Sequence, residues 1–325
     1  MIIAGIAVAA VALAPRSRWS AFVALAAGAA SVLLAGRWVA RDTLVSVGPM
    51  LLFLTAALGV AALAQRAGLA ERAAARLAEA GGPRRVYALV CASSALLTCL
   101  VSLDGAVVLM VPLVRAVSRR ASVPAAPLLA GAVAVANAAS LAVPEGNPTN
   151  LVVMSRLGLS PAQFLGHLFL PGLAATLLCA LVPLRRLGEP SEPVAETGPR
   201  FVVPWRIGAQ MTGLLAALDG IAPALSLHGA GLVALLAVAG GTAAAAALAN
   251  NLPVSASVAA LATAGPGAYA ALIGLSVGAL ATAHGSVATL IARDLAHDRR
   301  PWARVWTPAA AAAVALATLV LWSLS

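Results

Sequence analysis

The sequence predicts an all-α integral membrane protein made of two inverted repeats, each with a re-entrant hairpin and a broken transmembrane helix. Two observations carry this prediction. Hydrophobic residues make up 62% of the 325-residue chain and charged residues only 10%, which is far from the composition of a soluble domain. Two polar, helix-breaking runs, 144–150 and 283–289, interrupt apolar segments in the two halves. Broken helices at corresponding places in two halves are typical of membrane transporters.

The positive charge of the chain comes from arginine alone. The formal net charge is +10, and the 21 basic residues include no lysine. Basic loops beside apolar spans mark the cytoplasmic side of a membrane, and no basic run alternates with aromatic residues as nucleic-acid binding requires. Cys91, Cys99 and Cys179 are scattered in apolar segments and predict neither a disulfide framework nor a metal site. We therefore expect a lipid bilayer as partner, no nucleic acid and no cofactor.

The first repeat is predicted over residues 1–186. Residues 65–81 are too charged to span a membrane, and their amphipathic pattern predicts an interfacial helix. Arginines cluster at both ends of residues 86–119, which predicts a hairpin that enters and leaves on the cytoplasmic side, with Asp104 near its tip. The other apolar segments are predicted as spans at 2–14, 19–36, 44–64 and 164–184, and as a broken helix at 124–157.

The second repeat is predicted over residues 204–325, after a cytoplasmic linker at 187–203. Residues 229–264 contain no charge and are interrupted by Asn250-Asn251-Leu252-Pro253, so they predict a second hairpin that opens on the outer side. The remaining segments are predicted as spans at 205–225 and 305–325 and as a broken helix at 268–296. With this topology, only three arginines lie on the outer side of the membrane: Arg37, Arg41 and Arg156.

Three ionisable residues are candidates for proton transfer. A carboxylate at membrane depth is unfavourable and usually functional, so Asp104 either carries a proton or caps free amides at the hairpin tip. Glu145, in the first break, is either a second proton-linked site or a solvated residue. His284, in the second break, is either functional, because histidine titrates near neutral pH, or a hydrogen-bonded packing residue.

Neutral polar side chains supply the other candidate binding residues. They gather at the two tips and the two breaks, where they suit a polyhydroxyl solute or an oxyanion together with helix N-termini. Alternatively, they satisfy the broken backbone. The candidate residues for substrate binding, besides Asp104, are Ser102, Asn147, Thr149, Asn150, Asn250, Asn251, Ser286 and Thr289.

Four motifs, in order along the chain, carry a resemblance to a known family. Residues 102–114 resemble the hairpin segment of arsenite permeases of the ArsB type, and residues 136–151 are similar to the next signature of that family and to a loop of the wider ion transporter superfamily. Residues 250–253 and 285–290 resemble its Asn-Asn-Leu-Pro and Gly-Ser-x-Ala-Thr-Leu motifs. The four motifs cover most of residues 44–325.

The resemblance implies an elevator-type secondary transporter in the plasma membrane, with the substrate between two hairpin tips and two broken helices. In arsenite permeases the cargo is arsenite or antimonite, exported by proton exchange or with a cytoplasmic ATPase partner, and a homodimer is a further expectation. One departure is Leu103, which stands where the family has asparagine. The Ser-Asn-Thr motifs of sodium-coupled dicarboxylate relatives are also missing, which disfavours sodium coupling.

Other functions remain open at this point. A sodium/proton antiporter or a transporter of citrate, dicarboxylates or other anions would use the same fold. An intramembrane enzyme is a more remote alternative, because the chain has no zinc-protease, serine-hydrolase or paired-aspartate motif. A purely structural membrane subunit would have no use for two broken helices. Proton-coupled export of arsenite or antimonite is the leading prediction.

Overall fold

A computed structural model describes residues 20–35, 66–185, 187, 231–283, 285–296 and 303–325, with a few single residues and short pieces between 48 and 64. The predicted spans at 2–14 and 205–225, most of the span at 44–64, the linker after Leu187 and His284 lie outside the described residues. Within the described part, every regular element is a helix. Four helices are long and apolar enough to cross a membrane, so the predicted all-α membrane class is confirmed there.

The first described helices are α2 (Ser20–Ala35) and α4 (Leu69–Ala78). They are followed by a hairpin of α5 (Pro83–Val101) and α6 (Leu103–Ala121), in which Ser102 alone separates the two arms. A helix in three pieces comes next, and the long helix α9 (Pro161–Leu184) closes this half. The three pieces are α7 (Ala125–Ala139), the short 3-10 helix η1 (Pro144–Gly146) and α8 (Pro148–Leu157).

The second half repeats this order. Asn250 alone separates α11 (Leu232–Ala249) from α12 (Asn251–Leu261). Another three-piece helix follows, and α15 (Ala303–Leu324) ends the chain. Its pieces are α13 (Pro266–Val277), the 3-10 helix η3 (Gly278–Ala281) and α14 (Val287–Ala296).

The breaks are shorter than the sequence pattern suggests. Thr149 and Asn150 lie in the first turn of α8, because Pro148 occupies the first helical position and Asn147 caps the helix. Proline fits this position because its missing N–H would have no helical partner there. Thr289 likewise lies in the first turn of α14. These side chains therefore project from helix starts rather than from irregular loops.

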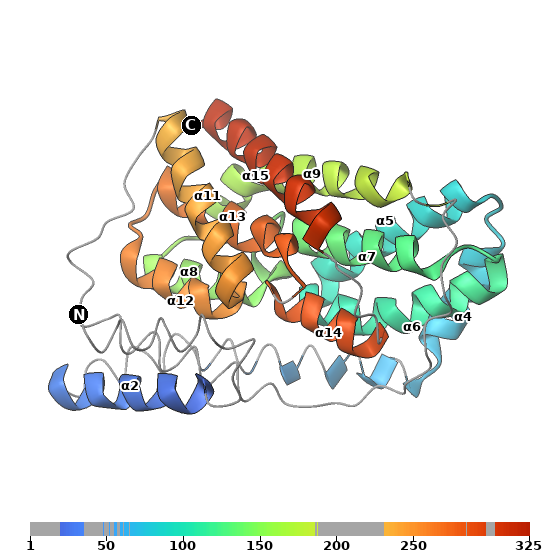
Figure 1. Cartoon of the computed structure of the whole chain (residues 1–325), viewed down its shortest axis with the longest axis horizontal. Helices are drawn as coiled ribbons and strands as arrows, with labels where there is room; N and C mark the ends of the chain where they lie inside the picture. The colour runs from blue at the N-terminus through green and yellow to red at the C-terminus, as the bar shows by residue number, and fades with distance from the viewer. Residues whose placement is uncertain are drawn as a thin grey trace.

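The helices of the two halves make equivalent contacts. In the first half α7 packs between α5 and α9, and in the second half α13 contacts α11 and α15. Across the halves, α6 contacts α14 and α8 contacts α12, so each hairpin packs against the broken helix of the other half. Figure 1 shows the two hairpins at opposite ends of the molecule, with α9 and α15 side by side along one edge.

Two buried hydroxyl groups make equivalent bonds in the two halves. The Ser94 hydroxyl on α5 donates to the Ala132 carbonyl on α7 at 2.6 Å. The Thr242 hydroxyl on α11 lies 2.9 Å from the Val238 carbonyl of its own helix and 3.2 Å from the Ala271 carbonyl on α13, so it shares its proton between the two helices. Ser94 precedes its hairpin tip by as many residues as Thr242 precedes the other tip. Each hairpin thus contacts its neighbouring broken helix through a hydroxyl group at an equivalent position.

Two glycines occupy equivalent places in the breaks. A Cβ atom on Gly146 would lie 2.7 Å from the backbone oxygen of Ser140, and a Cβ atom on Gly285 would collide with the backbone of Ala279. Gly146 and Gly285 are as far apart in the sequence as Ser140 and Ala279, and as Ala132 and Ala271. A side chain at either position is excluded, because the chain folds back on its own backbone there.

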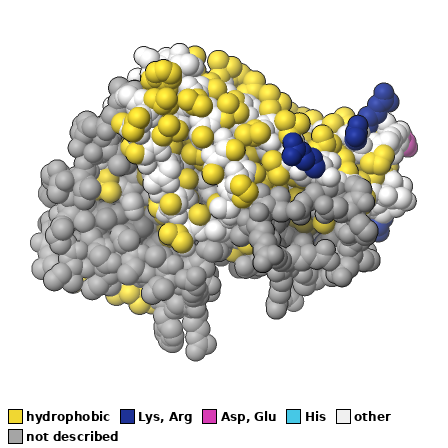
Figure 2. Space-filling model, turned by 45° about the horizontal axis from the view of Figure 1, so that its top comes forward, with side chains coloured by type: hydrophobic (Ala, Val, Ile, Leu, Met, Phe, Trp, Pro, Cys, Tyr) yellow, Lys and Arg dark blue, Asp and Glu magenta, His cyan; other side chains and the backbone are white. Residues whose placement is uncertain are grey.

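The outer surface of the long helices is apolar. Leu173, Leu177 and Leu181 on α9 and Leu319 and Trp322 on α15 are exposed. Figure 2 shows hydrophobic side chains over much of the face that it draws, with charged side chains toward the end that carries α4 to α6. Such a surface suits helices that contact lipid.

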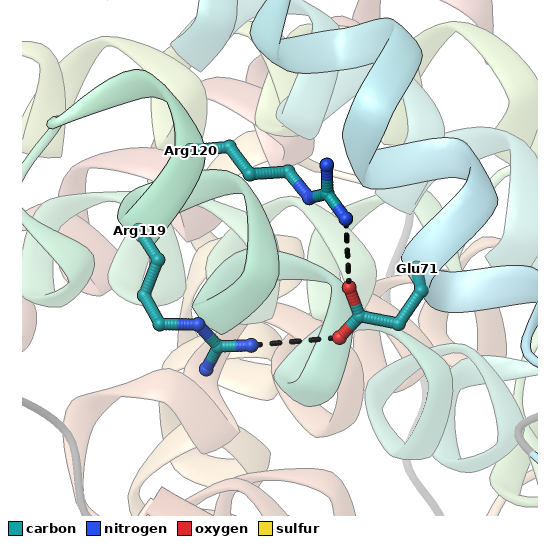
Figure 3. Close-up of polar contacts among 3 residues, drawn as sticks. All are labelled: Glu71, Arg119 and Arg120. Carbon is teal, nitrogen blue, oxygen red and sulfur yellow. Dashed lines mark hydrogen bonds and ion pairs between the residues drawn. The ribbon is translucent and has the colours of Figure 1, made fainter.

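The short helix α4 packs on the first hairpin. Ala74 is fully buried, and α4 contacts α6. Glu71 of α4 forms ion pairs with Arg119 at 3.4 Å and Arg120 at 3.5 Å at the end of α6, as Figure 3 shows. All three side chains are about half exposed, so we expect these pairs to contribute only about 0–1 kcal/mol.

Candidate functional site

The two hairpin tips share an unusual backbone conformation. Ser102 has φ 87° and Asn250 has φ 85°, and residues other than glycine rarely adopt positive φ. At each tip the backbone N–H of this residue closes the last turn of one arm, and its carbonyl accepts the first bond of the next arm. A single residue thus ends one helix and begins the next in this conformation. A sparsely populated backbone conformation of this kind costs roughly 1–3 kcal/mol of conformational free energy. Strain of this kind typically marks functional positions.

Asp104 lies buried in the first turn of α6, with 2% of its surface exposed. Its Oδ1 atom and the Ser102 hydroxyl have no hydrogen-bond partner among the described residues. Ser102 does not cap α6 with its side chain, whereas Asn147 and Asn250 cap α8 and α12. The Ser102 side chain therefore does not satisfy the first backbone N–H groups of α6, which begins next to the buried Asp104 carboxyl group.

In the first break, the side-chain amide nitrogens of Asn147 and Asn150 donate hydrogen bonds to the protein itself. The Asn150 Nδ2 group donates to the Ser140 carbonyl at 2.8 Å and to the Val143 carbonyl at 3.1 Å. The Asn147 Nδ2 group donates to the Ser140 hydroxyl at 3.3 Å, and its Oδ1 atom accepts from the Thr149 N–H. This leaves the Asn150 Oδ1 atom and the Thr149 hydroxyl buried without a partner among the described residues.

In the second break, the side chains of Ser286 and Thr289 bond to each other and to the local backbone. The Ser286 hydroxyl accepts from the Thr289 N–H at 3.0 Å, and the Thr289 hydroxyl donates to the Ser286 carbonyl at 2.8 Å. The Asn250 Oδ1 atom accepts from the Leu252 N–H at 3.1 Å. The Asn251 N–H donates to the Gly285 carbonyl at 2.7 Å, which joins the second hairpin tip to the second break.

Of the other two proton-linked candidates, only Glu145 is among the described residues, and it stands apart from this buried set. Glu145 is exposed at the surface of η1, so its side chain points away from the buried oxygens of the break. His284 lies outside the described residues. Asp104 is thus the one predicted proton-linked residue that the described structure places among buried polar groups.

The described part of the chain holds six buried side-chain oxygens without a hydrogen-bond partner. Four belong to predicted site residues, and the other two belong to Asn137 and Ser276, which sequence reasoning missed. Asn137 lies within the motif at residues 136–151, but nothing in the sequence separates it from a packing residue. Ser276 is a single small polar residue in an apolar helix and gives no signal. Leaving a buried polar atom unpaired costs about 1–3 kcal/mol.

This arrangement offers two kinds of binding groups. The side chains of the first half present acceptor oxygens and hydroxyls, and the uncapped start of α6 presents backbone donors at the positive end of a helix dipole. Such donors suit a small anion. The acceptor oxygens suit a proton-bearing group or a cation beside it. Among the described residues, no group of three or more His, Cys, Asp or Glu side chains could hold a metal ion.

Comparison with protein families places this arrangement in a known group. The model of the citrate transporter family matches residues 2–323, a region that includes both hairpins and both breaks. No curated protein matches the sequence. The matched family is part of the ion transporter superfamily, so the predicted resemblance is confirmed at the level of the superfamily. Members of this family are membrane transporters rather than enzymes. The chain therefore belongs to the citrate transporter family.

Proposed function

We propose that this protein is a secondary transporter that moves a small citrate-type anion across the cell membrane together with a proton on Asp104. The observation that carries the proposal is the buried start of α6. There, uncapped backbone N–H groups lie beside a carboxyl oxygen and a hydroxyl that have no partner among the described residues. In an apolar membrane protein, buried polar groups of this kind are candidates for contact with a transported ligand.

The coupling follows from competition for one helix end. The positive end of the α6 dipole attracts either the ionised Asp104 carboxylate or the carboxylate of a bound anion. Two like charges close together in a buried site repel, so one of them must be neutralised. Protonation of Asp104 leaves the helix start free for the anion. Each bound anion is then accompanied by a proton.

The proposed mechanism is alternating access by two inverted repeats, of the elevator type. It is supported by the equivalent hairpin contacts, by the hydroxyl bonds of Ser94 and Thr242, and by the breaks at Gly146 and Gly285. The crossed packing of α6 with α14 and of α8 with α12 also supports it, because each hairpin contacts the broken helix of the other half. Inverted repeats with broken helices are built for this kind of motion.

Export of arsenite or antimonite is the second candidate. It is favoured by residues 250–253 and 285–290, which match arsenite-permease motifs and meet through the Asn251–Gly285 hydrogen bond. Neutral arsenous acid carries three hydroxyl groups, which could donate to the acceptor oxygens of the first half. This candidate makes no use of the donor groups at the start of α6.

Uptake by the purified full-length chain in proteoliposomes tests both functions. Labelled citrate, succinate and arsenite are offered in parallel, each with an imposed pH gradient, a sodium gradient or neither. We expect citrate accumulation driven by the pH gradient, with no ATPase present. Accumulation of arsenite alone would favour the second candidate, and accumulation driven only by sodium would refute proton coupling. Failure to move any of the three would refute the proposed function.

A further inference from the structure

We propose that Asn137 and Ser276 contact the transported ligand, and that Asn137 selects ligands that present a hydroxyl or another protonated oxygen. This inference rests on the proposed transport function and names two binding residues that the motifs do not single out. It starts from their positions. Asn137 and Ser276 are as far apart in the sequence as Gly146 and Gly285, so they occupy equivalent places in the last turn before each break.

The hydrogen bonds of the described structure leave one polar atom of each residue unused. Both are fully buried, and the Asn137 Oδ1 atom and the Ser276 hydroxyl have no partner among the described residues. The usual solution for a hydroxyl in an apolar helix is a bond to the carbonyl one turn earlier. Thr98 and Thr318 make that bond, at 2.9 and 2.7 Å, but Ser276 does not. Its hydroxyl thus remains available to a ligand.

Hydrogen bonds connect Asn137 with the first break. The Ser140 hydroxyl donates to the Asn137 carbonyl at 2.8 Å and accepts from the Asn147 amide at 3.3 Å. The Ser140 carbonyl in turn accepts from the Asn150 amide. On the other side, α13, which carries Ser276, contacts both α7 and α8. Both residues therefore belong to the elements that form the site.

The chemistry of Asn137 determines what it recognises. Its Nδ2 group donates to the Val133 carbonyl at 2.9 Å, and the opposite orientation of the amide would place two acceptors face to face. The Oδ1 atom can therefore only accept. An ionised carboxylate has no proton to donate, so the partner of Asn137 must be a hydroxyl, a protonated carboxyl group or a cation. Citrate supplies a hydroxyl, and tricarballylate is the same tricarboxylate without it.

The test compares these two compounds in proteoliposomes that contain the full-length protein. We expect the wild-type protein to prefer citrate over tricarballylate by about tenfold or more, since a site that bonds a hydroxyl rejects the analogue without it. Asn137→Leu should raise the KM for citrate about tenfold, the effect of one hydrogen bond, and leave tricarballylate unchanged. Ser276→Ala should raise the KM for both compounds. In detergent without ligand, neither variant should lower the Tm.

Ser94→Ala is the matched control. It removes a hydroxyl that is equally buried but is bonded to the Ala132 carbonyl, so it should lower the Tm and leave both KM values unchanged. Unchanged KM values in Asn137→Leu and Ser276→Ala, or a loss of Tm in Ser276→Ala like that of the control, would overturn the inference. Equal use of citrate and tricarballylate by the wild type would overturn the selective role of Asn137.

A different result would refute the proposed function without refuting the inference about Asn137 and Ser276. If the wild-type protein moves arsenite but neither tricarboxylate, the citrate proposal is refuted. The inference then predicts a tenfold higher KM for arsenous acid in Asn137→Leu, because that ligand also presents hydroxyls, and an unchanged value would overturn it. If the wild-type protein moves no probe, both the proposed function and the inference are refuted.

Discussion

Replacing Asp104 with asparagine gives the sharpest test of coupling. The substitution keeps the shape of the side chain in a position that is 2% exposed, and it removes the charge permanently. Two unit charges about 4 Å apart at an effective dielectric constant of about 20 repel by roughly 4 kcal/mol. An affinity ratio of about a thousand corresponds to that energy. Asp104→Asn should therefore bind citrate at high pH as tightly as the wild type binds it when Asp104 is protonated.

Transport assays separate binding from coupling. With the proposed stoichiometry of one proton per anion, we expect the citrate KM of the wild type to change by up to about tenfold per pH unit where proton binding is limiting. In Asp104→Asn we expect a KM that does not vary with pH, retained exchange of internal for external citrate, and no accumulation driven by a pH gradient. Accumulation by the variant at the wild-type level would refute the role of Asp104 in coupling.

Three further substitutions test the fold around the site. Gly285→Ala should destabilise the protein by about 1–3 kcal/mol or more, because the added methyl group collides with the Ala279 backbone. We expect the same loss for Gly146→Ala. A Tm equal to that of the wild type in either variant would contradict the geometry of the breaks. Ser102→Gly should raise the Tm, since glycine adopts φ 87° without strain, and a lower Tm would show that the tip is not strained. Glu71→Gln should change the free energy of unfolding by less than about 1 kcal/mol, because its ion pairs are half exposed. Thermal unfolding in detergent measures this change. A larger loss would show that α4 contributes more to the stability of the hairpin than these ion pairs suggest.

The sequence predicts the tips and breaks well because they interrupt otherwise apolar segments. Polar runs with glycine and proline mark the positions where α5, α7 and α11 end, to within a few residues. The sequence cannot show which polar atoms form hydrogen bonds within the folded protein. Asn147 and Asn150 look alike in the sequence, yet the Oδ1 atom of the first caps a helix while that of the second has no partner among the described residues. That distinction depends on backbone positions that only the folded chain provides.

The two halves have the same architecture but different polar chemistry. At the second break, Ser286 and Thr289 bond to each other, and Asn250 caps α12. In the first half, Asp104 at the hairpin tip and Asn150 at the break keep buried oxygens without a partner among the described residues. Since the proposed alternating-access mechanism needs equivalent backbones but not equivalent side chains in the two halves, we expect the first half to contribute most of the specific ligand contacts. Substitutions that change ligand preference should therefore fall mainly between Ser102 and Asn150, and those in the second break should alter stability more than selectivity.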